Sequence, residues 1–255
     1  MNSNPILTVE NLTKDYYSPS GYKIRLFENL SFSVSPNEFT AILAPEGSGK
    51  SSLLKILAGI EKDFDGKVHD NAGRGMLLIP DKPDSYQWLS VFENVKFFAK
   101  NLSESEIKKI IADVGLEGYE NHFPHPKSAG FRLRISLARA IALNPTVILI
   151  DDALKNIDDH TTRREILELL RKLNFIYDEI TFVIALTNLT DAVFLADKIL
   201  LLAKHPAHLI ADIENDLPQN RGTEILLEPI FEEKTNEVKN KILEYDKNLI
   251  LKITV

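Results

Sequence analysis

The stretch from Ala44 to Ser51 reads Ala-Pro-Glu-Gly-Ser-Gly-Lys-Ser, a composition typical of a loop that closes around phosphate. It matches the pattern G-x-x-x-x-G-K-[ST] except that alanine stands at the first glycine. Small residues let successive backbone N–H groups surround phosphate oxygens, and a helix that follows adds the positive end of its dipole. We expect Lys50 to reach the β- and γ-phosphates and the Ser51 hydroxyl to ligate Mg²⁺. A chance Gly/Ser turn before a helix is the alternative.

Magnesium beside a phosphate needs a carboxylate as well as a hydroxyl, and an apolar run that ends in aspartate offers one. Residues 147–150 are continuously apolar and are followed by Asp151 and Asp152. We expect Asp151 to hold the ion through water. A buried strand that ends in a helix-capping aspartate is the alternative. The residues expected to contact the nucleotide around the loop are Ala44, Pro45, Glu46, Gly47, Ser48, Gly49, Lys50, Ser51 and Ser52.

These motifs need a strand before the loop and a helix after it, and the sequence predicts both. The apolar run Phe39–Leu43 leads into the loop, and we expect a helix over Ser51–Ala58 that Gly59 closes. Strand signals alternate with helix signals from end to end, which predicts an α/β fold. Short β-type runs separated by turn residues predict antiparallel hairpins before the loop, over Ile6–Leu12, Tyr22–Leu26 and Leu30–Val34.

The middle of the chain predicts helices. Ser103 to Glu106 form a capping box, and a second helix is expected over Phe131–Leu143, so we expect a small helical insert between about 83 and 144. Buried strands are then expected over Val147–Ile150 and Ile180–Leu186. Toward the end, Glu224–Tyr245 predicts a surface helix, and the alternation from Leu249 to Val255 predicts a short strand.

Composition excludes several classes of function. The 255 residues carry 30 Lys+Arg against 37 Asp+Glu, a net charge of −7, so no general attraction to nucleic acid is expected. The absence of cysteine excludes disulfides and thiolate metal sites and fits the cytoplasm. The first residues lack a basic segment followed by an apolar run, and the apolar runs are shorter than the ~20 residues that cross a bilayer. We therefore expect any membrane role to come through a partner.

Further motifs agree in order and spacing with one family. The chain resembles the nucleotide-binding subunits of ATP-binding cassette (ABC) transporters over nearly its whole length. Tyr16 falls where the family stacks an aromatic ring on adenine, and a tyrosine packing locally in a hairpin is the alternative. The other matching segments are residues 88–95 after the Q-loop, 127–134 for the signature, 156–158 for the D-loop, 187–192 for the switch, and 207–218, which is similar to the tail of nitrate, sulfonate or taurine importers.

The resemblance implies a phosphate-loop NTPase core with an N-terminal antiparallel β subdomain and an inserted helical subdomain. It places the nucleotide-binding domain at residues 1–218 and leaves 219–255 as a C-terminal helical extension. ATP and Mg²⁺ are the implied ligands, and membrane permease subunits and a second nucleotide-binding subunit, identical or not, are the implied partners. Ser128 and Gly130 would act in trans across a head-to-tail dimer, on the inner face of the cell membrane.

Four family positions differ here, and they are those that carry hydrolysis. The Q-loop glutamine is Asp81, which would then belong to the metal set; the glutamate after the Asp151 strand is Asp152; the switch histidine is Thr187; and the signature reads Lys-Ser-Ala-Gly from Lys127. Asp152 is shorter than glutamate by one methylene, and misplacing a base by about an ångström can lower a rate ~10²-fold. We therefore expect slow ATP hydrolysis that depends on Asp152 and Thr187.

Two other functions stay open at this point. The chain could bind ATP without turning it over and regulate or complete a heterodimer whose partner holds the competent site. It could instead be an unrelated phosphate-loop kinase or GTPase, although the segment from Ser128 to Gly130, placed before a helix and before Asp151, speaks against that.

Overall fold

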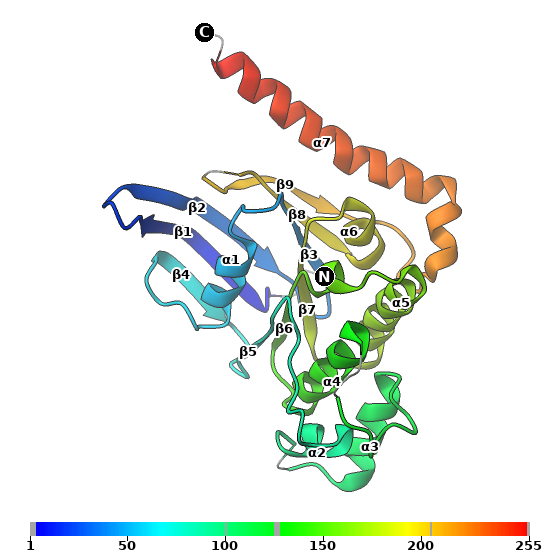
Figure 1. Ribbon diagram of the computed structural model, residues 1–255. Helices are drawn as coiled ribbons and strands as arrows, with labels where there is room; N and C mark the ends of the chain where they lie inside the picture. The colour runs from blue at the N-terminus through cyan, green and yellow to red at the C-terminus, as the bar shows by residue number, and fades with distance from the viewer. Residues whose placement is uncertain (1–3, 100, 125–127, 205, 254–255) are drawn as a thin grey trace.

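The computed structural model describes residues 4–99, 101–124, 128–204 and 206–253, and it contains two β-sheets with helices around them (Figure 1). The larger sheet has six strands in the order β5-β6-β7-β3-β8-β9. Its first five strands in that order run parallel, and β9 pairs antiparallel with β8. The strand bounds are β3 (Thr40–Leu43), β5 (Met76–Ile79), β6 (Val147–Asp151), β7 (Thr181–Leu186), β8 (Lys198–Leu202) and β9 (Leu209–Glu214).

The smaller sheet is antiparallel, in the order β2-β1-β4, and consists of β1 (Leu7–Tyr17), β2 (Lys23–Val34) and β4 (Asp65–Asp70). The runs predicted as two strands before and after Glu28 form the single strand β2. The register of β1 against β2 shifts between Leu12 and Lys14, so that Glu28 and Asn29 of β2 lie opposite one residue of β1. Asn29 adopts φ 49° at this point. An extra residue in one strand of a pair bends the ladder without ending it.

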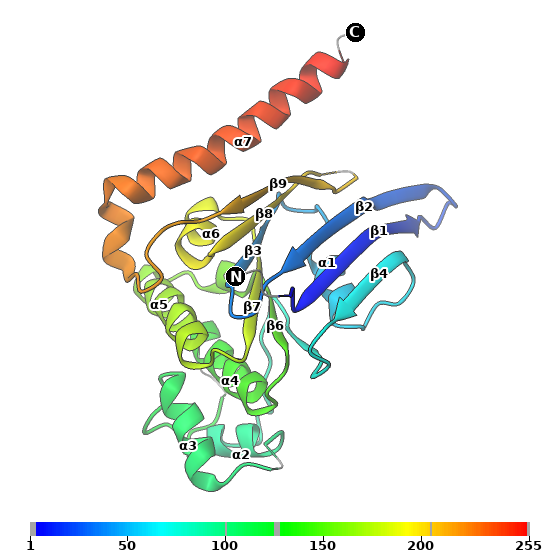
Figure 2. The same ribbon diagram turned by 180° about the vertical axis from the view of Figure 1, so that it is seen from behind.

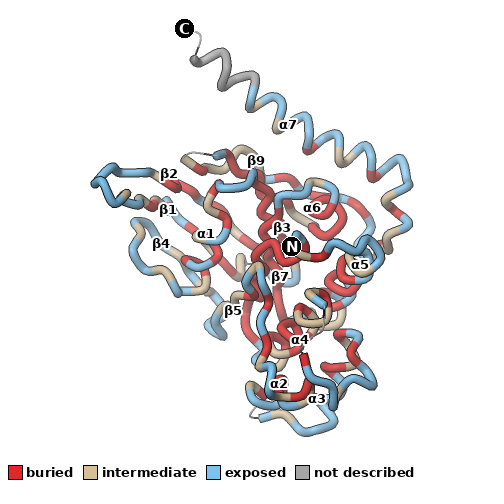
Figure 3. Tube along the Cα trace, viewed as in Figure 1, coloured by how far each residue is buried: buried red, intermediate tan, exposed pale blue. Residues whose placement is uncertain are grey.

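Alternation along the parallel strands divides the core into two clusters. One face of the sheet, with Val147, Leu149 and Val183, packs with α1 (Lys50–Leu57) and the antiparallel sheet. The other face, with Ile148 and Phe182, packs with the remaining helices. Figure 3 shows this buried material running through the central strands and the inward sides of the helices. Both faces of a parallel sheet must be covered, which is why the central residues of these strands are apolar.

Helices α2 (Val91–Lys96), α3 (Glu104–Asp113) and α4 (Ala129–Ala142) lie in the chain between β5 and β6 and group at one end of the molecule in both views (Figures 1 and 2). The predicted capping box of α3 is confirmed, because Ser103 accepts from the Glu106 amide while Glu106 accepts from the Ser103 amide. Helix α2 was not predicted, although Ser90 and Glu93 form the same box.

The remaining elements are η1 (Ala153–Asn156), α5 (His160–Ile176), α6 (Leu189–Leu195), η2 (Thr223–Leu227) and α7 (Pro229–Ile253). The predicted strand from Leu249 to Val255 is wrong, since α7 continues to Ile253 and the last two residues lie outside the described part. A strand needs a neighbour for its backbone hydrogen bonds, whereas extending a formed helix satisfies them within the segment. Among the described residues, none of the helices combines the length and the apolar character that crossing a bilayer requires.

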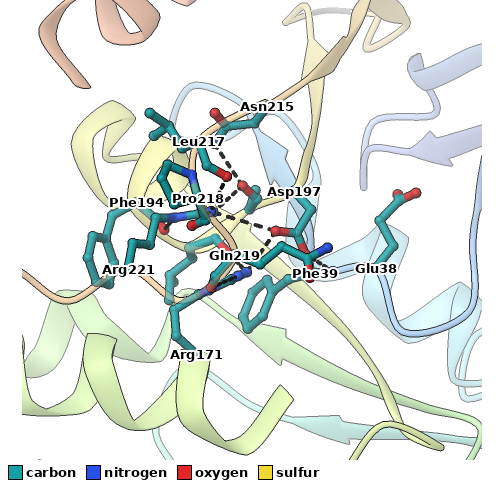
Figure 4. A network of polar contacts seen from close by, with 12 residues as sticks. Glu38, Phe39, Arg171, Phe194, Asp197, Asn215, Leu217, Pro218, Gln219 and Arg221 are labelled. Atoms are coloured by element: carbon teal, nitrogen blue, oxygen red, sulfur yellow. Dashed lines mark hydrogen bonds and ion pairs between the residues drawn. The ribbon is translucent and has the colours of Figure 1, made fainter. Parts of the chain in front are cut away.

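A buried polar network ties the segment after β9 to the core (Figure 4). Asp197 accepts from the Phe39 amide at 3.0 Å and from Arg171 at 2.9 Å, and the Arg221 guanidinium lies 3.6 Å from it. Arg221 also donates to the carbonyls of Phe194 and Ala196, each at 2.6 Å. Burial lowers the pKa of Arg221 to about 10, and neighbouring Arg171 acts in the same direction while Asp197 opposes it. The network fixes the start of β3, and with it the strand that carries the phosphate loop.

Candidate nucleotide site

The phosphate loop, Ala44 to Ser51, leaves the end of β3 and enters α1. Gly47 and Gly49 have φ 75° and 94°, in the left-handed region that favours glycine. A Cβ on Gly49 would also lie 2.9 Å from the Leu26 side chain. The buried Ser48 hydroxyl has no hydrogen-bond partner among the residues that the structure describes. A tight loop with an unpaired hydroxyl, placed before a helix N-terminus, fits an incoming phosphate.

Lys50 is buried at the first turn of α1, and its ammonium closes back on the loop. It donates to the carbonyls of Ala44 at 2.9 Å and Pro45 at 3.0 Å. Burial lowers the pKa of Lys50, while the charges of Asp152 and Asp151 raise it. An entering phosphate would replace two neutral carbonyls with an anionic partner, which forms stronger hydrogen bonds with an ammonium.

Asp151 ends β6 at the carboxyl edge of the parallel sheet, next to the loop. The Ser51 hydroxyl hydrogen-bonds its carboxyl, but burial acts more strongly and raises the Asp151 pKa. No group of three or more His, Cys, Asp or Glu within the described part of the chain could hold a metal ion. Mg²⁺ commonly takes one or two carboxylates, with phosphate oxygens and water completing its shell. The Ser51 hydroxyl and the Asp151 carboxylate fit Mg²⁺ that arrives with a nucleotide.

Asp152 and Thr187, which follow the adjacent parallel strands β6 and β7, contact each other. The Thr187 hydroxyl donates to Oδ2 of Asp152 at 2.7 Å. Asp152 is only 8% exposed and adopts φ 41°, a left-handed conformation that aspartate tolerates better than most residues. The sequence predicted both residues but not their contact. Their contact depends on β6 and β7 being neighbours in the sheet, an order that the sequence pattern does not specify.

Asp81 follows β5 and pairs with a lysine that the sequence analysis missed. Its carboxylate lies 3.3 Å from Nζ of Lys155 in η1, and its backbone carbonyl accepts from the Asn156 side chain at 2.6 Å. The assignment of Asp81 to the metal site stays a prediction. Lys155 carries no motif signal, so the sequence alone gave no reason to choose it.

Tyr16 lies near the end of β1 beside the first turn of α1. Its hydroxyl donates to Ser52 at 3.4 Å, and the Lys14 ammonium lies 4.7 Å from the ring centroid. The side chain is 38% exposed. A half-exposed ring next to the phosphate loop is accessible to a base, and the stacking itself stays a prediction.

Ser128 and Gly130 lie at the start of α4, an element separate from the phosphate loop. Ser128 caps the helix by accepting from the Phe131 amide at 3.3 Å. Gly130 is buried, and a Cβ there would lie 2.8 Å from Thr162 of α5. Lys127 lies outside the described residues. The trans role of Ser128 and Gly130 stays a prediction.

Residues 27–155 match the family described as ABC transporter. This segment contains the phosphate loop, Asp151, Asp152 and Lys155. The chain is an ABC transporter ATP-binding domain. The resemblance inferred from the motifs is therefore confirmed, and so is the α/β fold of a cassette.

Relatives and solved structures agree with this assignment. The cassette is 32% identical over 210 residues to the aliphatic sulfonates import ATP-binding protein SsuB 1 of Pseudomonas aeruginosa, covering 77% of this chain and 84% of that protein. It is 29% identical to an uncharacterized ABC transporter ATP-binding protein of Methanocaldococcus jannaschii, covering 96% and 93%. A subunit of an ABC transporter complex from Clostridium perfringens has a TM-score of 0.71 at 22% identity, covering 94% of this chain and 99% of that one, which supports the fold.

Proposed function

We propose that this cassette is the ATP-binding subunit of an ABC importer, which binds MgATP and couples it to transport through a membrane permease. The observation that carries the proposal is the placement of Lys50 and the Ser51–Asp151 contact around one glycine loop. Relatives whose names specify aliphatic sulfonate import favour the importer class. Two such cassettes would enclose ATP, with Ser128 and Gly130 of one chain facing the phosphate loop of the other.

Hydrolysis in this proposal runs through Asp152 and Thr187. Asp152 would accept the proton of the attacking water, and the Thr187 hydroxyl would hold the carboxylate in one orientation. When bound, Mg²⁺ would neutralise phosphate charge from the Ser51–Asp151 side. The shorter carboxylate leaves the base farther from the water than glutamate would, so turnover is slow.

An exposed aromatic cluster beside α2 supports docking on a permease. Tyr86 lies 5.3 Å from Trp88 and 5.5 Å from Phe97, by ring centroids, and the last two are 73% and 59% exposed. A cavity of about 360 Å³ opens beside the cluster, where the Arg139 guanidinium lies 4.4 Å from the Phe98 ring centroid. Exposed aromatic patches mark interaction sites on otherwise globular domains. The cassette would therefore sit on the inner face of the membrane through this surface.

ATP turnover by the purified cassette, alone and with co-expressed candidate permease subunits, tests the proposal. We expect slow hydrolysis that the permease stimulates. The variant Trp88→Ser should weaken co-purification with the permease, whereas Phe175→Ser, which removes an 80% exposed aromatic from α5, should not. Equal retention of both variants would refute the docking surface.

The second candidate is an ATP-binding subunit that does not hydrolyse and that regulates or completes a heterodimer. Two observations favour it: Asp81 is paired with Lys155, and Asp152 is shorter than glutamate. Neither Asp81 nor Asp152 is the glutamine or glutamate that carries hydrolysis in the family. ATP binding without turnover in any combination with neighbouring subunits would select this candidate.

A further inference from the structure

Lys155 stands at the phosphate end of the site although no nucleotide motif includes it. It lies in η1, which follows β6 directly, so the chain carries it to the same sheet edge as Asp151 and Asp152. Its ammonium is 3.3 Å from the Asp81 carboxylate. Its charge also acts on Asp151 and on Lys50. Lys155 is thus electrostatically part of the phosphate-binding centre.

Carboxylates are concentrated at this end of the loop. Asp151, Asp152 and Glu46 all act on Lys50, and Asp81 acts on Asp151. A nucleoside triphosphate adds further negative charge, with the largest share of any single phosphate at the γ-phosphate. Cations close to that phosphate are therefore needed to offset the repulsion, and Lys155 supplies one from the side of the sheet edge.

We propose that Lys155 is a second phosphate-binding residue, whose ammonium leaves Asp81 and pairs with the γ-phosphate when ATP binds, so that the site distinguishes ATP from ADP. This inference rests on the proposed function, since it assigns a specificity role within the same nucleotide site.

The resting ion pair is suited to such an exchange. The Lys155 and Asp81 side chains are 49% and 36% exposed, and ion pairs in contact with water contribute little. A γ-phosphate carries more charge than one carboxylate and offers more acceptor oxygens. The main chain at Asp81 is held by the Asn156 side chain, while the lysine stem is flexible. The lysine can move while Asp81 stays, and the released carboxylate becomes available to water around Mg²⁺.

The competing interpretation is that the pair only ties the segment after β5 to the segment after β6. A structural tie would affect ATP and ADP equally, because the two nucleotides differ only at the γ-phosphate. The ratio of the two affinities therefore separates the interpretations.

The test measures ATP and ADP affinities by calorimetry on the full chain, with Mg²⁺ and again with EDTA. We expect Lys155→Ala to weaken ATP binding roughly tenfold or more, the equivalent of one charge-assisted hydrogen bond, and ADP binding by less than about twofold. Lys155→Arg, which keeps the charge, should stay close to the wild type, and so should Lys239→Ala, which removes an exposed lysine from α7. An equal loss for both nucleotides, or no loss for either, would overturn the proposal.

A second variant guards against a folding defect in the first. Asp81→Asn removes the resting partner of Lys155, so it should raise the preference for ATP over ADP when measured in EDTA, where a metal role of Asp81 does not enter. A lower preference would contradict the exchange. Failure of the proposed function looks different, because then the wild type would bind neither nucleotide and Lys50→Ala would change nothing.

Discussion

The contact between Thr187 and Asp152 leads to a quantitative prediction about the rate of ATP hydrolysis. Replacing Asp152 by Glu and Thr187 by His together should raise ATP turnover at least about tenfold, because the longer carboxylate reaches the attacking water and the imidazole contacts the γ-phosphate. Each single replacement should gain less, since it disturbs the 2.7 Å hydrogen bond that now orients the carboxylate.

The magnitude follows from the burial and charge of the pair. Asp152 is only 8% exposed, and a hydrogen bond to a charged group contributes about 1.5–3 kcal/mol. A base displaced by about an ångström loses ~10²-fold, and a positioned proton acceptor contributes ~10²–10⁴-fold. The two substitutions should therefore be non-additive, with a coupling energy within the range of about 0.5–3 kcal/mol found for residues in contact.

The assay is phosphate release at saturating MgATP for the wild type, both single variants and the double variant. Thr187→Ser and Thr187→Val serve as controls, because serine keeps the donor and valine removes it at nearly constant volume. A wild-type rate already within ~1–10³ s⁻¹, or a double variant that gains nothing, would refute the view that these residues limit turnover.

Four further outcomes are expected. Lys50→Ala should strongly weaken calorimetric binding of ATP, since it removes the buried ammonium that closes on the loop; equal affinity would refute the phosphate-loop assignment. Tyr16→Ala should weaken ATP and GTP alike by about 1–3 kcal/mol, and unchanged affinities would leave Tyr16 a hairpin residue. Arg221→Ala should lower the urea-unfolding free energy by about 1–3 kcal/mol, because it takes the guanidinium donors away from the carbonyls of Phe194 and Pro218. Burial raises the pKa of Glu38 above 4.5, so its ionised form destabilises the fold as pH rises through that raised value; Glu38→Gln should increase the melting temperature at pH 7 but not below pH 4.

Local sequence patterns predicted the parallel part of the fold because its strands are buried on both faces. Residues 147–150 and 182–186 are apolar without interruption, and the capping box at Ser103 is a local signal of a helix start. The same signal at Ser90 begins α2, whose six residues are too few to show a helical spacing of apolar residues. The alternation that predicted a final strand failed because strand formation depends on a neighbour that the pattern cannot reveal.

The site was predictable where its chemistry needs particular residues in a row. The phosphate loop is such a case, since backbone amides, Lys50 and Ser51 act from consecutive positions. Contacts between strand ends could not be predicted in this way, because the order of β5, β6 and β7 in the sheet decides which residues meet. The pairs Thr187–Asp152 and Lys155–Asp81 both arise from that order.

The two pairs also bear on why the predicted differences from the family would occur together. The Thr187 hydroxyl hydrogen-bonds the Asp152 carboxylate directly. A histidine at position 187 would be matched to glutamate at position 152, whose carboxylate lies one methylene farther from the main chain. Likewise, Asp81 gives Lys155 an ion-pair partner in the nucleotide-free site. A neutral glutamine at position 81 would leave Lys155 with only the charges of Asp151 and Asp152. The predicted departures at Asp81, Asp152 and Thr187 thus each contact a neighbour across the sheet edge. Restoring one member of a pair therefore leaves a mismatch, and only paired substitutions test what the altered site can do.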